Sequence, residues 1–115
     1  MSPKIRVAVS LLHENLSRPL RVADLARSLE VSHSRLSHLF KTEVGLSPAQ
    51  YLKKIRMEKA CQLLETSFLR VKEIAAAVGY NDHTHFEREF KKAHGLTPLQ
   101  HRAEYLNATV KDKPA

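Results

Sequence analysis

An internal repeat constrains the fold of this chain more than any other feature of its sequence. A shift of 49 residues sets LRV at 20–22 on LRV at 69–71, and matched acidic, apolar and small positions follow. Beyond the turn in each copy the shift becomes 50, which sets GLSP at 45–48 on GLTP at 95–98. Two copies are too few for a stacked-repeat solenoid, which needs about three or more. The repeat therefore predicts two similar small units in one chain.

Each copy has the pattern of a short helix, a tight turn and a second helix. In the later copy, Gly79 and Tyr80 form the turn, Asn81 or Asp82 opens the second helix, and Gly95 ends it. Glycine ends helices because it adopts the left-handed conformation without a Cβ clash. A basic, hydrogen-bonding second helix after such a turn is typical of a DNA-reading helix-turn-helix.

The second helix of each copy has an apolar face and a polar face. Phe86, Phe90 and Ala93 share the inward face of the later helix, and Leu36 and Phe40 share that of the earlier one. The outward faces carry Ser34, Ser37, His38 and Lys41 in the first copy and Thr84, Glu87, Arg88 and Lys91 in the second. Each outward set spans only about 100° of a helix, which is narrow enough to enter one groove.

Composition limits the class of protein. At 115 residues the chain is one domain in size, or two very small units that lean on each other. Its 19 basic and 12 acidic residues give a net charge of +7, which favours a polyanionic partner. The single cysteine, Cys61, excludes an internal disulfide and fits a reducing compartment. Without a signal peptide or an apolar run near ~18 residues, we expect a cytoplasmic protein with no membrane partner.

The other segments predict an all-α chain of about seven helices, organised as one domain over residues 1–106. Its expected parts are a first helix from Ser2 to Leu16, a first helix-turn-helix at about 20–46, a linker helix at about 47–66, a second helix-turn-helix at about 69–96 and a last short helix through about Tyr105. Residues 107–115 have nothing to bury and are expected to form a disordered tail.

The predicted linker helix has a length that suits DNA. Roughly 19 residues at ~1.5 Å each form a rod of about 30 Å. Successive major-groove faces of B-DNA recur every ~34 to 36 Å. A stiff linker of this length is expected to set the two reading helices about one duplex turn apart.

Four stretches carry a family resemblance through their order and spacing. They are SRLSHLFK from residue 34, GLSPAQYL from residue 45, RMEKACQLLETS from residue 56 and IAAAVGYNDHTHFEREFKKAHGLTPLQHR from residue 74. Together they resemble the DNA-binding domain of the AraC/XylS family of bacterial transcription regulators. The resemblance covers residues 20–102 and implies a two-lobed domain with two recognition helices in successive major grooves. It also implies transcription activation, often through contact with RNA polymerase.

The resemblance implies DNA-binding residues on both second helices. Carried over position by position, the base-facing sites of the family are Ser34, Ser37 and His38, with Arg35 beside them, and His83, Thr84, Glu87 and Arg88. Three lysines, Lys41, Lys91 and Lys92, lie toward the helix ends, where phosphate contact is expected. His101 stands where the family typically has an aromatic ring, usually tyrosine.

Arg88 is the strongest candidate for reading a base. Arginine donates two hydrogen bonds to guanine O6 and N7, which discriminates by ~1 to 3 kcal/mol, and the neighbouring Glu87 can accept from cytosine N4. The alternative is a solvated arginine paired with an acid one helical turn away. The positions three and four residues away hold Thr84, His85, Lys91 and Lys92, none of which is acidic.

The seven histidines raise the question of a metal or catalytic site. His83 and His85 point about 200° apart on a helix, so they cannot chelate one ion together. Cys61 has no second ligand at zinc spacing, which leaves only His94 and His101 for folding to bring together. The sequence has no nucleophile elbow, catalytic carboxylate pair or glycine-rich phosphate loop. We therefore expect no enzyme activity, no cofactor and no metal.

Two other functions remain open at the level of the sequence. A helical adaptor could use the same basic face on an acidic protein, and a nonspecific coat would bind nucleic acid without sequence preference. If roughly six phosphates are neutralised, DNA binding should show a slope of about −5 in log K against log salt. Because two reading helices in one chain can cover an asymmetric site, we expect this piece to be a monomer, with dimerisation only through a domain absent here.

Overall fold

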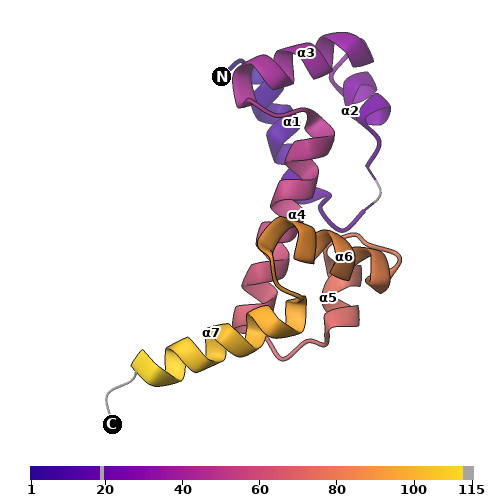
Figure 1. Ribbon diagram of the computed structural model, residues 1–115. Helices are drawn as coiled ribbons and strands as arrows, with labels where there is room; N and C mark the ends of the chain where they lie inside the picture. Colours follow the sequence, from indigo (N-terminus) through magenta and orange to yellow (C-terminus); the bar gives the residue numbers. More distant parts are fainter. Residues whose placement is uncertain (19, 113–115) are drawn as a thin grey trace. The chain divides into compact units, whose positions relative to one another are not determined.

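The computed structural model describes residues 1–18 and 20–112, which contain helices and no strands (Figure 1). The helices are α1 (Pro3–Glu14), α2 (Val22–Ser28), α3 (His33–Val44), α4 (Pro48–Thr66), α5 (Val71–Ala77), α6 (His83–His94) and α7 (Pro98–Asp112). The prediction of an all-α fold of about seven helices is confirmed. None of these helices combines the length and apolar character that a membrane crossing needs.

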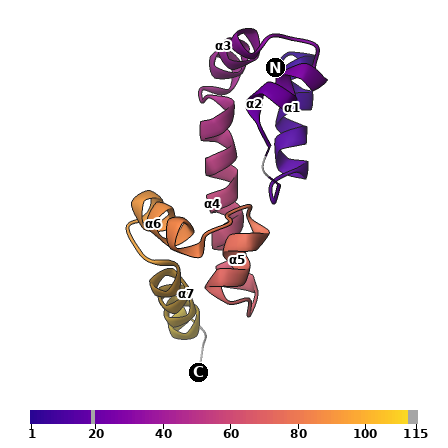
Figure 2. The same ribbon diagram turned by 90° about the vertical axis from the view of Figure 1, so that its right-hand side faces the viewer.

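The chain forms two compact units, Met1–Arg56 and Met57–Ala115, and the division falls inside α4. In the first unit α2 packs on α3, and in the second α5 packs on α6 (Figures 1 and 2). The first half of α4 closes the first unit, and α7 occupies the equivalent place in the second. The repeat seen in the sequence is thus a repeat of helix order.

Local chemistry sets the ends of the two second helices where the sequence predicts them. The Ser32 hydroxyl accepts a hydrogen bond of 3.1 Å from a backbone N–H in the first turn of α3. The Asp82 carboxylate accepts one of 2.9 Å from the first turn of α6. Gly45 and Gly95 follow these helices at φ of 92° and 78°, the left-handed conformation that glycine adopts at low cost.

The same capping pair starts the helix that follows each helix-turn-helix. At the start of α4, Ser47 N–H donates to Gln50 Oε1 at 3.0 Å, and Gln50 N–H donates back to Ser47 Oγ at 3.2 Å. Thr97 and Gln100 repeat this exchange at 2.9 and 3.2 Å at the start of α7. Two backbone donors that lack a partner within the helix are satisfied each time, which fixes where α4 and α7 begin.

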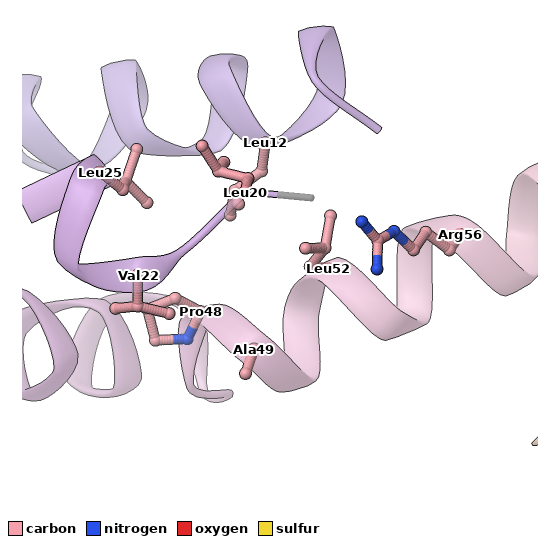
Figure 3. A pocket seen from close by; sticks show the side chains of 8 residues that line it. All are labelled: Leu12, Leu20, Val22, Leu25, Pro48, Ala49, Leu52 and Arg56. Carbon is pink, nitrogen blue, oxygen red and sulfur yellow. The ribbon is translucent and has the colours of Figure 1, made fainter. Parts of the chain in front are cut away.

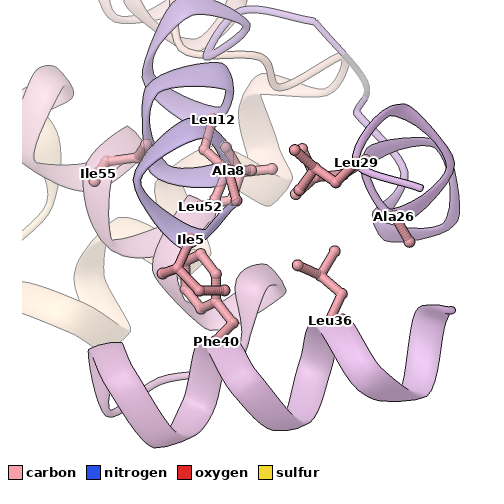
Figure 4. Close-up of a cluster of buried hydrophobic side chains, with 10 residues drawn as sticks. Ile5, Ala8, Leu12, Ala26, Leu29, Leu36, Phe40, Leu52 and Ile55 are labelled. Carbon is pink, nitrogen blue, oxygen red and sulfur yellow. The ribbon is translucent and has the colours of Figure 1, made fainter. Parts of the chain in front are cut away.

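Aromatic side chains fill the centre of each unit. The core of the first unit draws on four helices and consists of Ile5, Ala8, Leu12, Leu25, Ala26, Leu29, Leu36, Phe40, Leu52 and Ile55 (Figure 4). Phe40 is fully buried there and meets the Tyr51 ring edge-on at 5.6 Å between centroids. In the second unit Phe86 and Phe90 are fully buried, and their centroids lie 5.8 Å apart.

The last helix is longer than predicted. α7 continues to Asp112, whereas the sequence predicted an end near Tyr105 and a disordered tail from residue 107. No glycine or proline stands between residues 99 and 112 to stop the helix, and the Thr109 hydroxyl donates to the Tyr105 carbonyl at 2.8 Å. That part of the tail prediction is wrong, and residues 113–115 lie outside the described residues.

Two smaller predictions also differ from the structure. Ala93 was expected on the inward face of α6, but it is exposed in the last turn of the helix, two residues before the Gly95 C-cap. The first helix, α1, begins after Ser2 as predicted, but it ends at Glu14 and not at Leu16. The Ser2 hydroxyl does not cap α1, because it donates instead to Glu43 on α3 at 3.0 Å.

We predict that Phe40→Ala and Phe90→Ala each lower the free energy of unfolding by ~3 to 5 kcal/mol, because each removes a fully buried ring and leaves a cavity. Urea denaturation monitored by circular dichroism would measure the change. Val7→Ala is a matched control, since Val7 is an apolar residue that is 47% exposed and should change the free energy by no more than about 0.5 kcal/mol. An unfolding curve of Phe90→Ala that matches the unmodified chain would contradict the core assignment.

Candidate nucleic-acid interface

The outward side of α6 presents most of its predicted residues to solvent. His83, Thr84, Arg88, Lys91 and Lys92 are exposed, and Glu87 is half-buried. Phe86 and Phe90 hold the opposite side of the helix in the core. Within the described part of the chain, no hydrogen bond or ion pair engages Arg88, so its guanidinium donors face solvent. Among the described residues, Arg88 is therefore not paired with an acid one helical turn away, which was the alternative to base reading.

The outward side of α3 has the same organisation in the first unit. Ser34, Arg35, His38 and Lys41 are exposed, and Ser37 is half-buried. Leu36 and Phe40, at 1% and 0% exposure, anchor the inward side. In both units the buried positions leave one continuous face of hydrogen-bonding and basic side chains, so each predicted set lies together on its own helix.

A pair of side chains beside the outward face of α6 was not predicted from the sequence. His85 Nε2 lies 3.4 Å from Glu89 Oε1, and the Tyr80 ring meets the His85 ring edge-on at 5.4 Å. Tyr80 also packs against Phe86, with centroids 5.4 Å apart. The two ring contacts hold Tyr80, in the turn before α6, against the first turn of that helix. The spacing of four residues between His85 and Glu89 was the signal that could have revealed the pair.

Two arginines with no role predicted from the sequence hold the connection that precedes each helix-turn-helix. Arg56 Nε and Nη2 donate to the Leu16 and Arg18 carbonyls at 3.1 and 2.9 Å. Arg102 Nε and Nη2 donate to the Leu64 and Ser67 carbonyls at 3.0 and 3.3 Å. Each guanidinium binds carbonyl groups in the last turn of a helix or just after its end. These charge-assisted hydrogen bonds set the position of the helix-turn-helix that follows.

Arg56 also borders a small cavity of about 170 Å³ in the first unit (Figure 3). The other lining residues are apolar and comprise Leu12, Leu20, Val22, Leu25, Pro48, Ala49 and Leu52. The guanidinium already donates to backbone carbonyls, and the walls carry no nucleophile, acid or base. The cavity offers no groups for catalysis, so the exposed faces of α3 and α6 remain the main candidate site.

Known proteins resemble this chain in both sequence and fold. The family model described as a helix-turn-helix domain matches residues 25–104. The chain is 41% identical over 99 residues to the raffinose operon transcriptional regulatory protein RafR of Pediococcus pentosaceus, a match that covers 86% of this chain and 36% of RafR. The C-terminal domain of AraT, a response regulator from Geobacillus stearothermophilus, gives a TM-score of 0.87 at 40% identity and covers 90% of this chain and 86% of that domain.

The chain belongs to the AraC-type helix-turn-helix family. The DNA-binding domain of AdpA, solved in complex with a target DNA, gives a TM-score of 0.88 at 28% identity and covers 97% of this chain and 100% of that domain. Membership of this family makes the chain a binding module and not an enzyme. It spans about a third of the length of the curated relatives it matches.

His101 keeps the packing role of the ring that is typical of AraC-type domains. Its ring meets Phe90 edge-on at 5.7 Å, as Tyr51 meets Phe40 at 5.6 Å in the first unit. Its Nε2 lies 2.8 Å from Glu65 Oε2. The equivalent polar contact of the Tyr51 hydroxyl is to His13 Nε2, at 2.9 Å. The imidazole therefore replaces the phenol in both its packing and its polar contact.

At the C-terminal end of α6, Cys61, His94 and His101 lie near one another. His94 Nε2 lies 3.5 Å from Cys61 Sγ, and the two histidine rings are 6.2 Å apart. Burial, and then the charges of Glu65 and Glu58, raise the pKa of Cys61. Partial burial, and then the His101 charge, lower the pKa of His94. No group of three such residues in the described ranges is placed to hold a metal ion.

We predict that His94 makes the second unit less stable in mild acid. Because the folded-state pKa lies below the ordinary value of 6.5, the unfolded chain binds this proton more readily. Well above pH 6.5, His94 is neutral in both the folded and the unfolded chain, and folding loses no stability through it. As the pH falls toward the lowered pKa, the unfolded chain takes up the proton first, and the free energy of unfolding decreases. Urea denaturation from about pH 7.5 to about 5 should show a shallower loss of stability for His94→Gln than for the unmodified chain.

His33→Gln is the control for this pH series, since His33 is an exposed histidine on α3 in the other unit. It should follow the pH dependence of the unmodified chain. If His94→Gln follows it as well, the His94 environment does not contribute to acid sensitivity.

Proposed function

We propose that this chain is the DNA-binding module of a transcription regulator, which binds double-stranded DNA sequence-specifically by inserting α3 and α6 into major grooves. The observation that carries this proposal is the repeated arrangement of a buried aromatic anchor and an exposed polar, basic face on α3 and again on α6. The likeness to the AdpA domain, which was solved on a target DNA, supports the same conclusion. The net charge of +7 supports a polyanionic partner.

The side chains of α6 divide into two chemical roles under this proposal. Arg88 donates to guanine O6 and N7, and Glu87 accepts from the N4 amino group of cytosine. Exposure of Arg88 and its lack of a partner in the described residues support the first role. Lys91 and Lys92, in the last turn of α6, contact phosphates and fix the register without reading sequence.

The side chains of α3 give the first unit a different preference. His38, the counterpart of Arg88 in the repeat, donates to a base or a phosphate, and Ser34 and Ser37 bond to phosphates or bridging water. Lys41 lies in the last turn and contacts a phosphate. Because the two faces differ in chemistry, we propose an asymmetric site of two segments. The length of α4, 19 residues or about 28 Å, supports a spacing near one duplex turn.

A single chain binds this site as a monomer under the proposal, because it supplies both reading helices itself. The module is expected to act as an activator through contact with RNA polymerase, as the family resemblance implies. Transcription in vitro from a promoter that carries the bound site tests this step. A rise in transcript supports activation, whereas a fall assigns the module to a repressor.

We predict that selection from a random duplex library near physiological salt enriches two segments about 10 bp apart, bound by one chain. The retained duplexes would be sequenced, and sedimentation would give the stoichiometry. The slope of log K against log salt on the enriched duplex should be about −5. Enrichment of one segment would restrict reading to one unit, binding without enrichment would indicate a nonspecific coat, and no binding would favour an adaptor of acidic proteins.

We predict that Arg88→Ala lowers affinity for the selected duplex more than for a scrambled duplex, because only the base contact depends on sequence. Lys91→Ala, on the same face of α6, is the matched control and should weaken both duplexes by the same factor. Fluorescence anisotropy titrations of both variants on both duplexes measure the difference. Equal losses for Arg88→Ala on the two duplexes would remove its base-reading role.

A further inference from the structure

A hollow of about 510 Å³ on the first unit lies between the start of α1 and α3. Its walls are apolar side chains, Ser2, two cations and one acid, and they comprise Pro3, Val31, Leu39, Ser2, Lys4, Arg35 and Glu43. Both cations are exposed. Lys4 has no role in the DNA-binding face described above, although it shares this hollow with a residue at the edge of that face.

The position of the hollow on α3 suggests what its cations meet. Arg35 follows Ser34 by one residue and therefore lies about 100° around the helix from the centre of the outward face. Leu39 and Glu43 lie still further round, toward the side that packs on α1. The hollow thus begins where the outward face ends. When a helix lies in a major groove, its flanks face the phosphate backbones that border the groove.

The start of α1 is held to α3 by Glu43. The Glu43 carboxylate accepts hydrogen bonds from the Ser2 backbone N–H and, at 3.0 Å, from the Ser2 hydroxyl. The N–H bond is the largest cause that lowers the pKa of Glu43, which keeps the carboxylate ionised. Its oxygens are therefore engaged with Ser2, and Lys4 stands two residues further along the first turn of α1.

These observations lead to one further inference, which rests on the DNA binding proposed above. We propose that Lys4 is an additional phosphate contact of the first unit, beside Arg35, and that Glu43 is the positioning residue that holds it there. The occupant of the flank is the DNA backbone, because two cations and continuity with the outward face of α3 favour a polyanion. The apolar walls cover the methylene stem of Lys4 while its ammonium reaches outward.

The second unit lacks the same flank. The counterpart of Arg35 in the repeat is His85, and the counterpart of Leu39 is Glu89. His85 Nε2 and Glu89 Oε1 lie 3.4 Å apart, so the Glu89 carboxylate stands beside the His85 ring. In the first unit the apolar Leu39 takes the place of Glu89, and the one carboxylate that lines the hollow, Glu43, is hydrogen-bonded to Ser2. The additional contact therefore belongs to the first unit alone.

The test compares Lys4→Gln with Arg6→Gln. Arg6 is also an exposed cation on α1, but it lies two residues further on and points about 200° away from Lys4. Each variant removes one positive charge from the same helix. Affinity of the complete chain for a mixed-sequence duplex of roughly 30 bp, about three helical turns, would be measured by anisotropy over a series of salt concentrations.

For Lys4→Gln we expect the slope of log K against log salt to shrink by about 0.9, with roughly fivefold weaker binding near ~0.15 M salt. Arg6→Gln should keep the slope and affinity of the unmodified chain. If Lys4→Gln and Arg6→Gln behave alike on DNA that the unmodified chain binds, the Lys4 contact is wrong while the proposed function stands. If the unmodified chain shows no salt-dependent binding, the proposed function itself fails.

A double-mutant cycle tests the positioning role of Glu43. If Glu43 holds Lys4 at the flank, the loss caused by Lys4→Gln should be smaller in a Glu43→Ala background than in the unmodified chain. A purely structural role for Glu43 predicts the same loss in both backgrounds, which would overturn the positioning part of the proposal. Because Lys4 is exposed, Lys4→Gln should not affect folding, and its effect on affinity reports the lost contact.

Discussion

The packing of one buried phenylalanine against one ring from the following helix is the interaction on which each unit depends. Phe40 meets Tyr51, and Phe90 meets His101, in the same edge-on geometry. Because these rings fix the inward side of α3 and α6, the opposite side must face solvent. An exposed polar face is therefore a consequence of core packing, which is why a fold of this size can present a rigid polar surface.

Polar contacts to the backbone then fix the chain segments that lead into and out of each helix-turn-helix. Arg56 and Arg102 bind carbonyl groups at the ends of α1 and α4, and the capping pairs at Ser47 and Thr97 fix the starts of α4 and α7. Backbone groups at helix ends need such partners, since they have none within the helix. The two units use similar chemistry at these points and differ in the side chains they expose, so similar scaffolds carry different outward faces.

Much of the fold was predictable because it depends on local chemistry. The α4 bounds, the caps at Ser32 and Asp82 and the left-handed Gly45 and Gly95 follow from turn and capping preferences that act over a few residues. The end of α7 was less predictable, since low hydrophobicity near the C-terminus was taken as disorder although no helix-breaking residue stood there. The contact between Ser2 and Glu43 was not predictable, because the two residues are 41 positions apart in the chain.

The sequence by itself determined the helices, the repeat and the residues that share each outward face, because helical periodicity and capping are local. Only the tertiary structure decided which polar side chains are engaged. It binds Glu43 to Ser2, holds Arg56 and Arg102 on backbone carbonyls, and leaves Arg88 exposed. These contacts join residues far apart in the chain, and they form only when burial of the aromatic anchors brings the helices together.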